Sequence, residues 1–328
     1  MAQLRVVVVL VITTVCLVAA LWGIDLSVAG QTVIDARWSQ LVWIIPVYYG
    51  THVLRVWRMQ ALLDRHVRFG QVLSILSVGY LAIHVVPFRM GEFVRPYLLS
   101  ERAGMPFASG LAAILVERLL DMMMLLGLLV SVAWLVELPP SGIVVQGIDV
   151  LAAGQKLAGT LVLIGIGGLI AVLGLGERLL RLTDRLPGGR IARSLYAGFS
   201  AVPRHPARIG GLLLISAAIW LVTILGVWLC LNAFEGLPTA FSAAYVIWTV
   251  VLAGTSAVPT PGFFGVFEAS CVAAVLLYGG EPHLAQTFAV VLHLSQFGFT
   301  AFNGVLFLFW EGLSLRQLVG ASRVQAGA

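Results

Sequence analysis

Charged residues are scarce in this chain: 20 Lys+Arg and 15 Asp+Glu make up 11% of its 328 residues, whereas 60% of the residues are apolar. Soluble globular domains carry roughly 25% charged residues, so a water-soluble globule would lack the polar surface to cover it. An intrinsically disordered chain is excluded because its apolar content would be low. The composition indicates an all-α polytopic integral membrane protein, with residues 1–328 forming one transmembrane domain.

Lysine is almost absent, since Lys156 is the only one and it follows Gln155. A P-loop needs a Gly-Lys pair to hold phosphates, so we expect no ATP-binding motif. The three cysteines lie in apolar stretches without a CxxC pair, and no Cys/His cluster resembles a zinc site. The sequence therefore predicts no cofactor, no metal and no enzymatic activity.

The formal net charge of +5 does not indicate a nucleic-acid partner. The arginines lie in short stretches between apolar runs, and basic stretches of that kind mark the cytoplasmic side of a membrane protein. These basic stretches are 55–68, 89–102 and 177–208. The positions where acidic residues dominate, which we expect outside, are 25–37, 137–156, 235 and 281.

Windows of about 20 apolar residues predict the membrane segments. They are 6–24, 38–59, 71–88, 107–136, 157–175, 209–234, 241–258, 264–278 and 284–309. Segment 71–88 lies between two basic stretches, and the pair 241–258 and 264–278 lies between two acidic positions. Each should therefore enter and leave on one side, and short segments broken by proline and glycine favour re-entrant hairpins.

This pattern predicts six full spans and two re-entrant hairpins that enter from opposite faces. Both termini would be cytoplasmic, in a bacterial inner membrane. Paired interrupted segments indicate a transport site near the middle of the membrane. The alternative is an ordinary bundle of eight to nine spans with proline kinks.

Some charged residues occur where lipid would surround them: Glu117, Arg118 and Asp121 lie within segment 107–136. Glu117 and Asp121 share a helix face at spacing i,i+4, and Arg118 can pair with Asp121 at i,i+3. A charge at bilayer depth costs at least ~2.5 kcal/mol and usually pairs or faces a wet cavity. The residues indicate either a structural ion pair, with Glu117 neutral or bound to another helix, or a polar cavity wall that meets a lipid headgroup.

A second charged stripe lies at 89–95, where Arg89, Glu92 and Arg95 recur at every third position. At the mouth of a hairpin these arginines would suit a phosphate, because a guanidinium group can bind it bidentately. The alternative is interfacial anchoring combined with a topology signal.

A third motif interrupts the chain between segments 241–258 and 264–278. Its residues are Pro259, Pro261, Gly262, Gly265 and Glu268. Proline removes backbone donors and glycine permits unusual dihedral angles, so the helix must break here. Glu268 follows in an apolar stretch, where a carboxylate is a functional candidate. A hydrogen-bonded structural carboxylate is the alternative.

The motifs R-x-G-E-x-x-R at 89–95, E-R-x-x-D at 117–121 and P-x-P-G-x-x-G-x-x-E at 259–268 together resemble the lysylphosphatidylglycerol synthase transmembrane (flippase-like) family. The resemblance covers nearly the whole chain. It implies a stand-alone flippase-like module, and the end of the chain at Ala328 leads us to expect no synthase domain. One position departs from the family pattern. The family's usual Pro-Gly-Gly is replaced by Pro261-Gly262-Phe263 in this chain, which predicts a less flexible hairpin tip.

On this resemblance we expect a transporter that moves a phospholipid or other amphipathic lipid between leaflets. Arg89 and Arg95 would hold an anionic headgroup at the cytoplasmic entrance. The residues expected to line one connected cavity are Arg89, Glu117, Arg118, Asp121 and Glu268. A lipid-synthesis enzyme and a second copy of the chain are candidate protein partners.

Two alternatives to transport remain open. The chain could be a non-catalytic accessory protein of a lipid, hopanoid or glycolipid pathway. It could also be an intramembrane serine hydrolase built on Ser256, within Gly254-Thr255-Ser256-Ala257, and on His293. A serine nucleophile needs a base within hydrogen-bonding reach.

Overall fold

The computed structural model describes residues 26–63, 67–85, 91–135, 144–145, 148–149, 160, 206–258 and 260–312. Several predicted features lie outside these ranges: the segment 6–24, the segment 157–175 except residue 160, most of the stretch 177–208, Arg89, Pro259 and both termini. Within the described ranges the predicted all-α fold is confirmed. The exception is a pair of two-residue strands, β1 (Val144–Val145) and β2 (Ile148–Asp149), which pair antiparallel.

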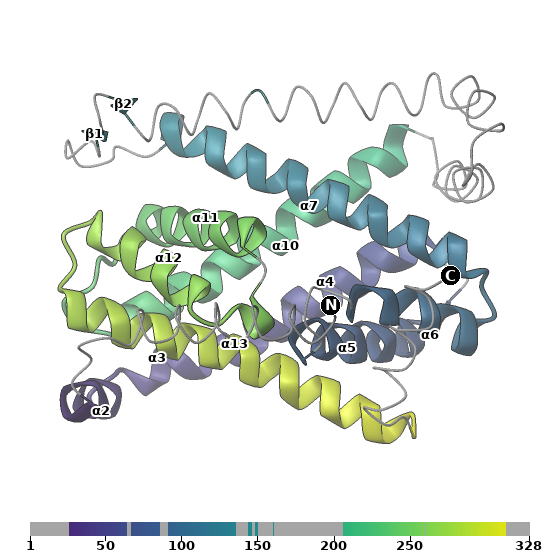
Figure 1. The fold of residues 1–328 in the computed structure, drawn as a ribbon, viewed down its shortest axis with the longest axis horizontal. Coiled ribbons are helices and arrows are strands. Elements are labelled where there is room, and N and C mark those ends of the chain that lie inside the picture. Colours follow the sequence, from purple (N-terminus) through teal and green to yellow (C-terminus); the bar gives the residue numbers. More distant parts are fainter. Residues whose placement is uncertain are drawn as a thin grey trace, which may run out of the picture.

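Long helices form the frame of the molecule (Figure 1). They are α4 (Ile44–Leu62), α7 (Phe107–Leu135), α10 (Pro206–Asn232) and α13 (Pro282–Trp310), with the short helices α2 (Leu26–Ile34) and α3 (Trp38–Val42) before them. Of the described helices, α10 and α13 are long and apolar enough to cross a membrane. Helix α7 is as long as α13, with 29 residues each, but it carries the charged residues Glu117, Arg118 and Asp121.

Residues 69–103 fold back on themselves as the first hairpin, which consists of α5 (Phe69–Val85), a turn at 91–93 and α6 (Val94–Ala103). Gly91 permits this return. A Cβ atom at position 91 would lie 2.3 Å from the backbone carbonyl carbon of Ala82 on α5, and backbone atoms of a helix cannot move aside. The glycine of the R-x-G-E motif is therefore required by the close approach of the chain to α5.

The second hairpin consists of α11 (Phe241–Ala257), the single turn η2 (Pro261–Phe263) and α12 (Val266–Leu276). The predicted break is confirmed, because Gly262, Phe263 and Gly265 have φ angles of 60°, 62° and 83°. Phe263 is the one non-glycine residue with a positive φ in the described part of the chain. It stands where the Pro-Gly-Gly pattern has its second glycine, and the left-handed conformation costs such a residue roughly 1–2 kcal/mol.

The first hairpin packs against the second half of α13. Near the start of α5, Ser74 donates a hydrogen bond of 2.8 Å to Glu311, just after the end of α13. Near the end of α5, the ring of His84 lies 5.6 Å from that of Phe297, in the middle of α13. Helix α5 therefore runs from the carboxyl end of α13 to its midpoint.

The second hairpin packs against the first half of α13. At the start of α12, Phe267 stacks on His293 with ring centroids 4.3 Å apart, and α12 then runs back toward the amino end of α13. The tips of the two hairpins meet, with His84 edge-on to Phe263 at 5.3 Å. This is the arrangement that two re-entrant hairpins entering from opposite faces would produce, and the number of membrane spans stays a prediction.

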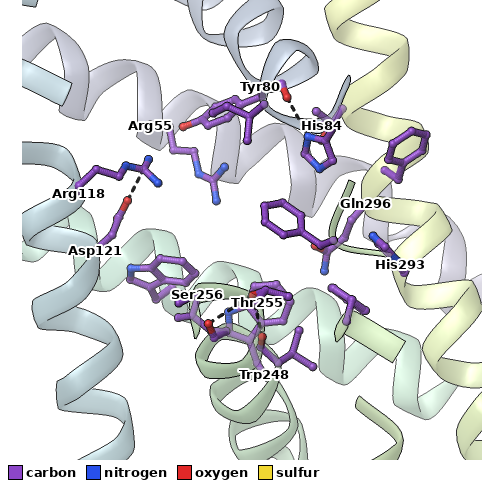
Figure 2. A pocket seen from close by; sticks show the side chains of 18 of the residues that line it. Arg55, Tyr80, His84, Arg118, Asp121, Trp248, Thr255, Ser256, His293 and Gln296 are labelled. Atoms are coloured by element: carbon purple, nitrogen blue, oxygen red, sulfur yellow. Dashed lines mark hydrogen bonds and ion pairs between the residues drawn. The ribbon is translucent and has the colours of Figure 1, made fainter. Parts of the chain in front are cut away.

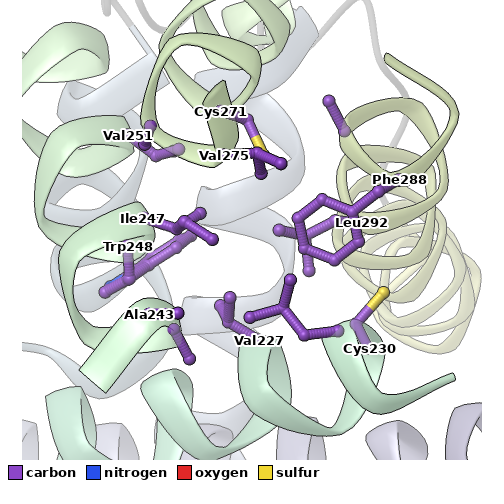
Figure 3. Packing of buried hydrophobic residues seen from close by; sticks show 14 of the residues in the cluster. Val227, Cys230, Ala243, Ile247, Trp248, Val251, Cys271, Val275, Phe288 and Leu292 are labelled. Atoms are coloured by element: carbon purple, nitrogen blue, oxygen red, sulfur yellow. The ribbon is translucent and has the colours of Figure 1, made fainter. Parts of the chain in front are cut away.

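Two apolar clusters accompany the two hairpins. One gathers the second hairpin with α10 and α13, where Ile247, Phe288 and Leu292 interdigitate (Figure 3). Cys230 and Cys271 lie in this cluster as buried free thiols. The other cluster gathers the first hairpin with α4. Each hairpin thus has its own apolar packing.

Candidate functional site

A cavity of about 210 Å³ lies where the two hairpin tips meet. Its wall is built from both hairpins together with α4, α7, α10 and α13 (Figure 2). The titratable side chains that line it are Arg55, Tyr80, His84, Glu92, Arg118, Asp121 and His293. Aromatic rings make up much of the remaining wall. A polar cavity inside so apolar a chain is the first candidate for function.

Glu117 is the centre of an ion-pair network beside this cavity. Its Oε1 atom lies 2.7 Å from Arg95 Nη1 on α6 and 2.7 Å from Arg118 Nη2 on its own helix. Arg58 on α4 approaches its other oxygen at 3.8 Å. Glu117 and Arg95 are both 0% exposed. The carboxylate therefore joins α4, α6 and α7, and three cations together repay its desolvation.

Asp121 completes the network one turn further along α7. Arg58 Nη1 donates to its Oδ1 at 2.7 Å, and Arg118 Nη2 lies 3.3 Å from its Oδ2. The predicted i,i+3 pair of Arg118 and Asp121 is therefore confirmed, but as one contact of a larger network. Glu92 adds a longer contact of 4.0 Å to Arg118. The positive charges of Arg58, Arg95 and Arg118 thus equal in number the negative charges of Glu92, Glu117 and Asp121. Buried charges need such compensation.

Arg55 is a fourth arginine outside this balance. No carboxylate lies within ion-pair distance of it in the described part of the chain; its guanidinium lies over the ring of Tyr80, 5.1 Å from the centroid. Figure 2 shows it reaching from α4 toward the middle of the cavity. The sequence placed Arg55 and Arg58 both at the end of the segment 38–59 and in the basic stretch 55–68, and α4 includes both because it continues to Leu62. The helix can extend because the carboxylates of α7 compensate Arg58.

Glu268 and His293 close the tip of the second hairpin. His293 Nε2 lies 2.9 Å from the carbonyl oxygen of Gly262, which can only accept, so Nε2 carries a hydrogen. Its Nδ1 lies 2.6 Å from Glu268 Oε1, and one proton is shared between these two atoms. The pair is therefore neutral overall. The other oxygen of Glu268 accepts from the Gly265 N–H at 2.7 Å, which caps α12.

The structure brings some of the predicted site residues together and separates others. Glu92, Arg118 and Asp121 line the cavity. Arg95 and Glu117 lie behind its wall, so Arg95 does not reach the entrance where we expected it to hold a headgroup. Glu268 lies behind His293, and His293 itself lines the cavity. The residues that shape the second tip are Pro261, Gly262 and Gly265; Arg89 and Pro259 lie outside the described residues.

The serine hydrolase alternative receives no support from the geometry. Ser256 and His293 both line the cavity. However, His293 engages both of its ring nitrogens with Glu268 and Gly262. Neither nitrogen is available as a base for Ser256, and activation of a serine needs that hydrogen bond.

Sequence reasoning missed Arg55 and Arg58 as site residues, although a signal was present. The two arginines are spaced i,i+3, which places them on one helix face, and the apolar segment 38–59 includes both. It also missed Trp220 and Trp248, which line the cavity from α10 and α11. Indole rings in apolar segments carry no pattern that separates a cavity wall from ordinary packing.

Comparison with known proteins gives two matches. The family model described as the lysylphosphatidylglycerol synthase TM region matches residues 5–304. A UPF0104 membrane protein of Methanothermobacter thermautotrophicus is 22% identical over 291 residues, and the match covers 84% of this chain and 85% of that relative. No solved structure matches the chain.

Proposed function

Because the chain belongs to the lysylphosphatidylglycerol synthase transmembrane-region family, whose model matches residues 5–304, we propose that it is a transporter that moves lipids between the leaflets of a membrane. We place it in a bacterial inner membrane with both termini in the cytoplasm, as the basic stretches predict. The lipid headgroup would pass through the cavity between the hairpins, while the acyl chains stay in the surrounding lipid.

The cavity at the meeting point of the hairpin tips is the observation that carries this proposal. It lies beside the midpoint of α13, a helix long and apolar enough to cross a membrane. A headgroup must lose water to pass the bilayer centre, and fixed polar groups there would replace that water. Broken segments that meet at half depth are typical of transport sites.

The hairpins also offer a way to open the cavity to each side in turn. The contacts that join the two tips are between aromatic rings, such as His84 and Phe263. Each hairpin is held by its own apolar cluster. One hairpin could therefore shift against the other without breaking the packing inside either of them.

Reconstitution in liposomes tests the proposal. Purified protein and head-labelled lipids of several classes are incorporated, and translocation is followed with and without a pH gradient. A variant that fills the cavity, Ser256→Trp, should abolish translocation, because Ser256 lines the cavity. The matched control is Leu214→Trp, at a 73% exposed position on α10, which should translocate lipid like the parent.

Two outcomes would contradict the proposal. One is no translocation above empty liposomes for any lipid class. If the protein then co-purified with a lipid-modifying enzyme, the accessory role would replace transport. The other is an unchanged rate in Ser256→Trp, which would place the lipid path elsewhere.

A further inference from the structure

The cavity wall contains several N–H donors that have no acceptor. Trp220 Nε1, Trp248 Nε1, Gln296 Nε2 and Arg118 Nε are buried without a hydrogen-bond partner in the described part of the chain. All four residues line the cavity. Both tryptophans are only 7% exposed. Buried donors of native proteins are nearly always paired, so each of these needs an explanation.

Among the described residues, the cavity wall has no comparable set of buried acceptors without a hydrogen-bond partner. The two carboxylates that line the cavity, Glu92 and Asp121, already face arginines. The one buried acceptor without a partner among the described side chains is Glu117 Oε2, and Glu117 does not line the cavity. A group that pairs with these donors must therefore supply hydrogen-bond acceptors.

The charges in and behind the cavity wall also favour an occupant that supplies acceptors, namely an anion. Arg58, Arg95 and Arg118 are balanced by three carboxylates, and no carboxylate in the described ranges lies within ion-pair distance of Arg55. The network and Arg55 together thus carry one excess positive charge. An occupant with a net charge of −1 would neutralise it, whereas a zwitterionic occupant brings its own cation and would leave the excess positive charge in place. An occupant with a net positive charge would add repulsion.

Size limits the occupant further. Sites for drug-sized ligands measure about 300–1,000 Å³, and this cavity of about 210 Å³ is smaller. It fits a phosphate with a small substituent, but neither an oligosaccharide nor an entire lipid.

Building on the transport function proposed above, we propose that the cavity binds a compact monoanionic phosphodiester headgroup. Arg55 would bind its non-bridging oxygens, and Trp248 and Gln296 would donate to its remaining acceptors. The guanidinium is already held over Tyr80, so little side-chain freedom is lost on binding. A lipid with an aminoacylated, net-cationic headgroup would be a poor occupant, although the family name refers to such a lipid.

Direct binding to the purified full-length chain in detergent tests this inference. The probes are phosphatidylglycerol, phosphatidylcholine and lysylphosphatidylglycerol with identical acyl chains, and soluble sn-glycerol 3-phosphate. Phosphatidylglycerol should bind about 10-fold or more tightly than the other two lipids, because of the three its headgroup alone carries a net charge of −1. Equal affinities for the three lipids would overturn the inference. If sn-glycerol 3-phosphate bound as tightly as phosphatidylglycerol, the occupant would be a soluble phosphate ester instead of a lipid.

Variants assign the preference to the cavity. Arg55→Gln should abolish the preference for phosphatidylglycerol, and Arg55→Lys should keep part of it because the charge remains. The control is Arg37→Gln, since Arg37 lies on the surface and pairs with Glu235. Thermal unfolding of each variant verifies that it is folded. An undiminished preference in folded Arg55→Gln would overturn the assignment.

A second variant tests the donors separately from the charge. Trp248→Phe keeps an aromatic ring in the wall but removes the Nε1 donor, and it should weaken phosphatidylglycerol binding several-fold. Trp43→Phe, at a 63% exposed position, is its control. Unchanged binding in Trp248→Phe would remove this residue from the site.

Failure of this inference can be told apart from failure of the transport proposal. If no lipid is translocated but phosphatidylglycerol still binds selectively through Arg55, the transport proposal is wrong and the binding site stands. If anionic and zwitterionic lipids are translocated equally by the parent and by Arg55→Gln, transport stands and the assigned headgroup site is wrong.

Discussion

The two hairpins share an architecture but are held in place by different interactions. Each packs on one half of α13. The first is tied to its neighbours by charge, because Arg95 on α6 pairs with the buried Glu117 on α7. The second is closed by backbone hydrogen bonds and by one proton shared between Glu268 and His293.

This difference shows how an apolar protein can use carboxylates in two ways. Glu117 must stay ionised, since three arginines surround it and none of them can lose its proton. Glu268 belongs to a pair that is neutral in either arrangement of its proton. Replacing each carboxylate by its neutral amide should therefore have unequal effects, and the predictions below test this comparison in order of expected size.

The largest effect is expected from Glu117→Gln. The amide leaves the buried Arg95 without a carboxylate partner, whereas Arg58 and Arg118 keep Asp121. Loss of one partner from a buried ion network costs roughly 3–5 kcal/mol. The fraction of folded protein and the thermal unfolding midpoint in detergent measure this cost. Glu235→Gln is the control, because Glu235 pairs with Arg37 at the exposed surface and such pairs contribute little. Equal midpoints for the two variants would contradict the role of Glu117.

Gly91→Ala should have the next largest effect. The new methyl group would lie 2.3 Å from the backbone of Ala82, so the turn must move away from α5; overpacking of this kind costs typically 1–3 kcal/mol. The control is Gly127→Ala on α7, where no atom lies within 4 Å of the added methyl group. That substitution should stabilise the helix slightly. The unfolding midpoints of both variants give the comparison, and an unperturbed Gly91→Ala would show that the hairpin reverses differently.

Glu268→Gln should have the smallest effect. Its amide oxygen can still accept from the Gly265 N–H, and its amide hydrogens can donate to His293 Nδ1, so every polar atom of the tip keeps a partner. We expect a loss of about 1 kcal/mol from weaker, uncharged hydrogen bonds. Glu268→Ala, which leaves His293 Nδ1 and the Gly265 N–H unpaired, should cost more. If Glu268→Gln were as damaging as Glu117→Gln, the two hairpins would not differ in the way described.

The second hairpin could be predicted from the sequence, whereas the first differs: α5 is unbroken over Phe69–Val85, and the chain returns through α6 (Val94–Ala103), inside the stretch 89–102 that the sequence assigns to the cytoplasm. Proline and glycine in the motif at 259–268 predicted a broken backbone, and the φ angles of Gly262 and Gly265 confirm it. The conformation of Phe263 could not be predicted, because a left-handed φ at a bulky residue contradicts local preference. The ring of Phe263 packs edge-on against His84 of the other hairpin, and this tertiary contact accompanies a conformation that the local sequence opposes.

The candidate site was only partly visible in the sequence. The spacing of Arg118 and Asp121 predicted their pairing, since residues three apart on a helix are neighbours. Arg58 and Asp121 are 63 positions apart, and no local pattern relates them. The same holds for Glu268 and His293, which are 25 positions apart and belong to different helices.

The sequence by itself determined the class of the protein, the places where its helices break and the helix face that carries its charges. These follow from composition, from the backbone limits of proline and glycine, and from helical periodicity, all of which are local. The tertiary structure decided which charges are neutralised, and among the described residues it leaves Arg55 without a carboxylate within ion-pair distance, over the ring of Tyr80. That outcome depends on how α4, α6 and α7 pack together, because a charge inside an apolar protein is compensated by whatever lies next to it in space.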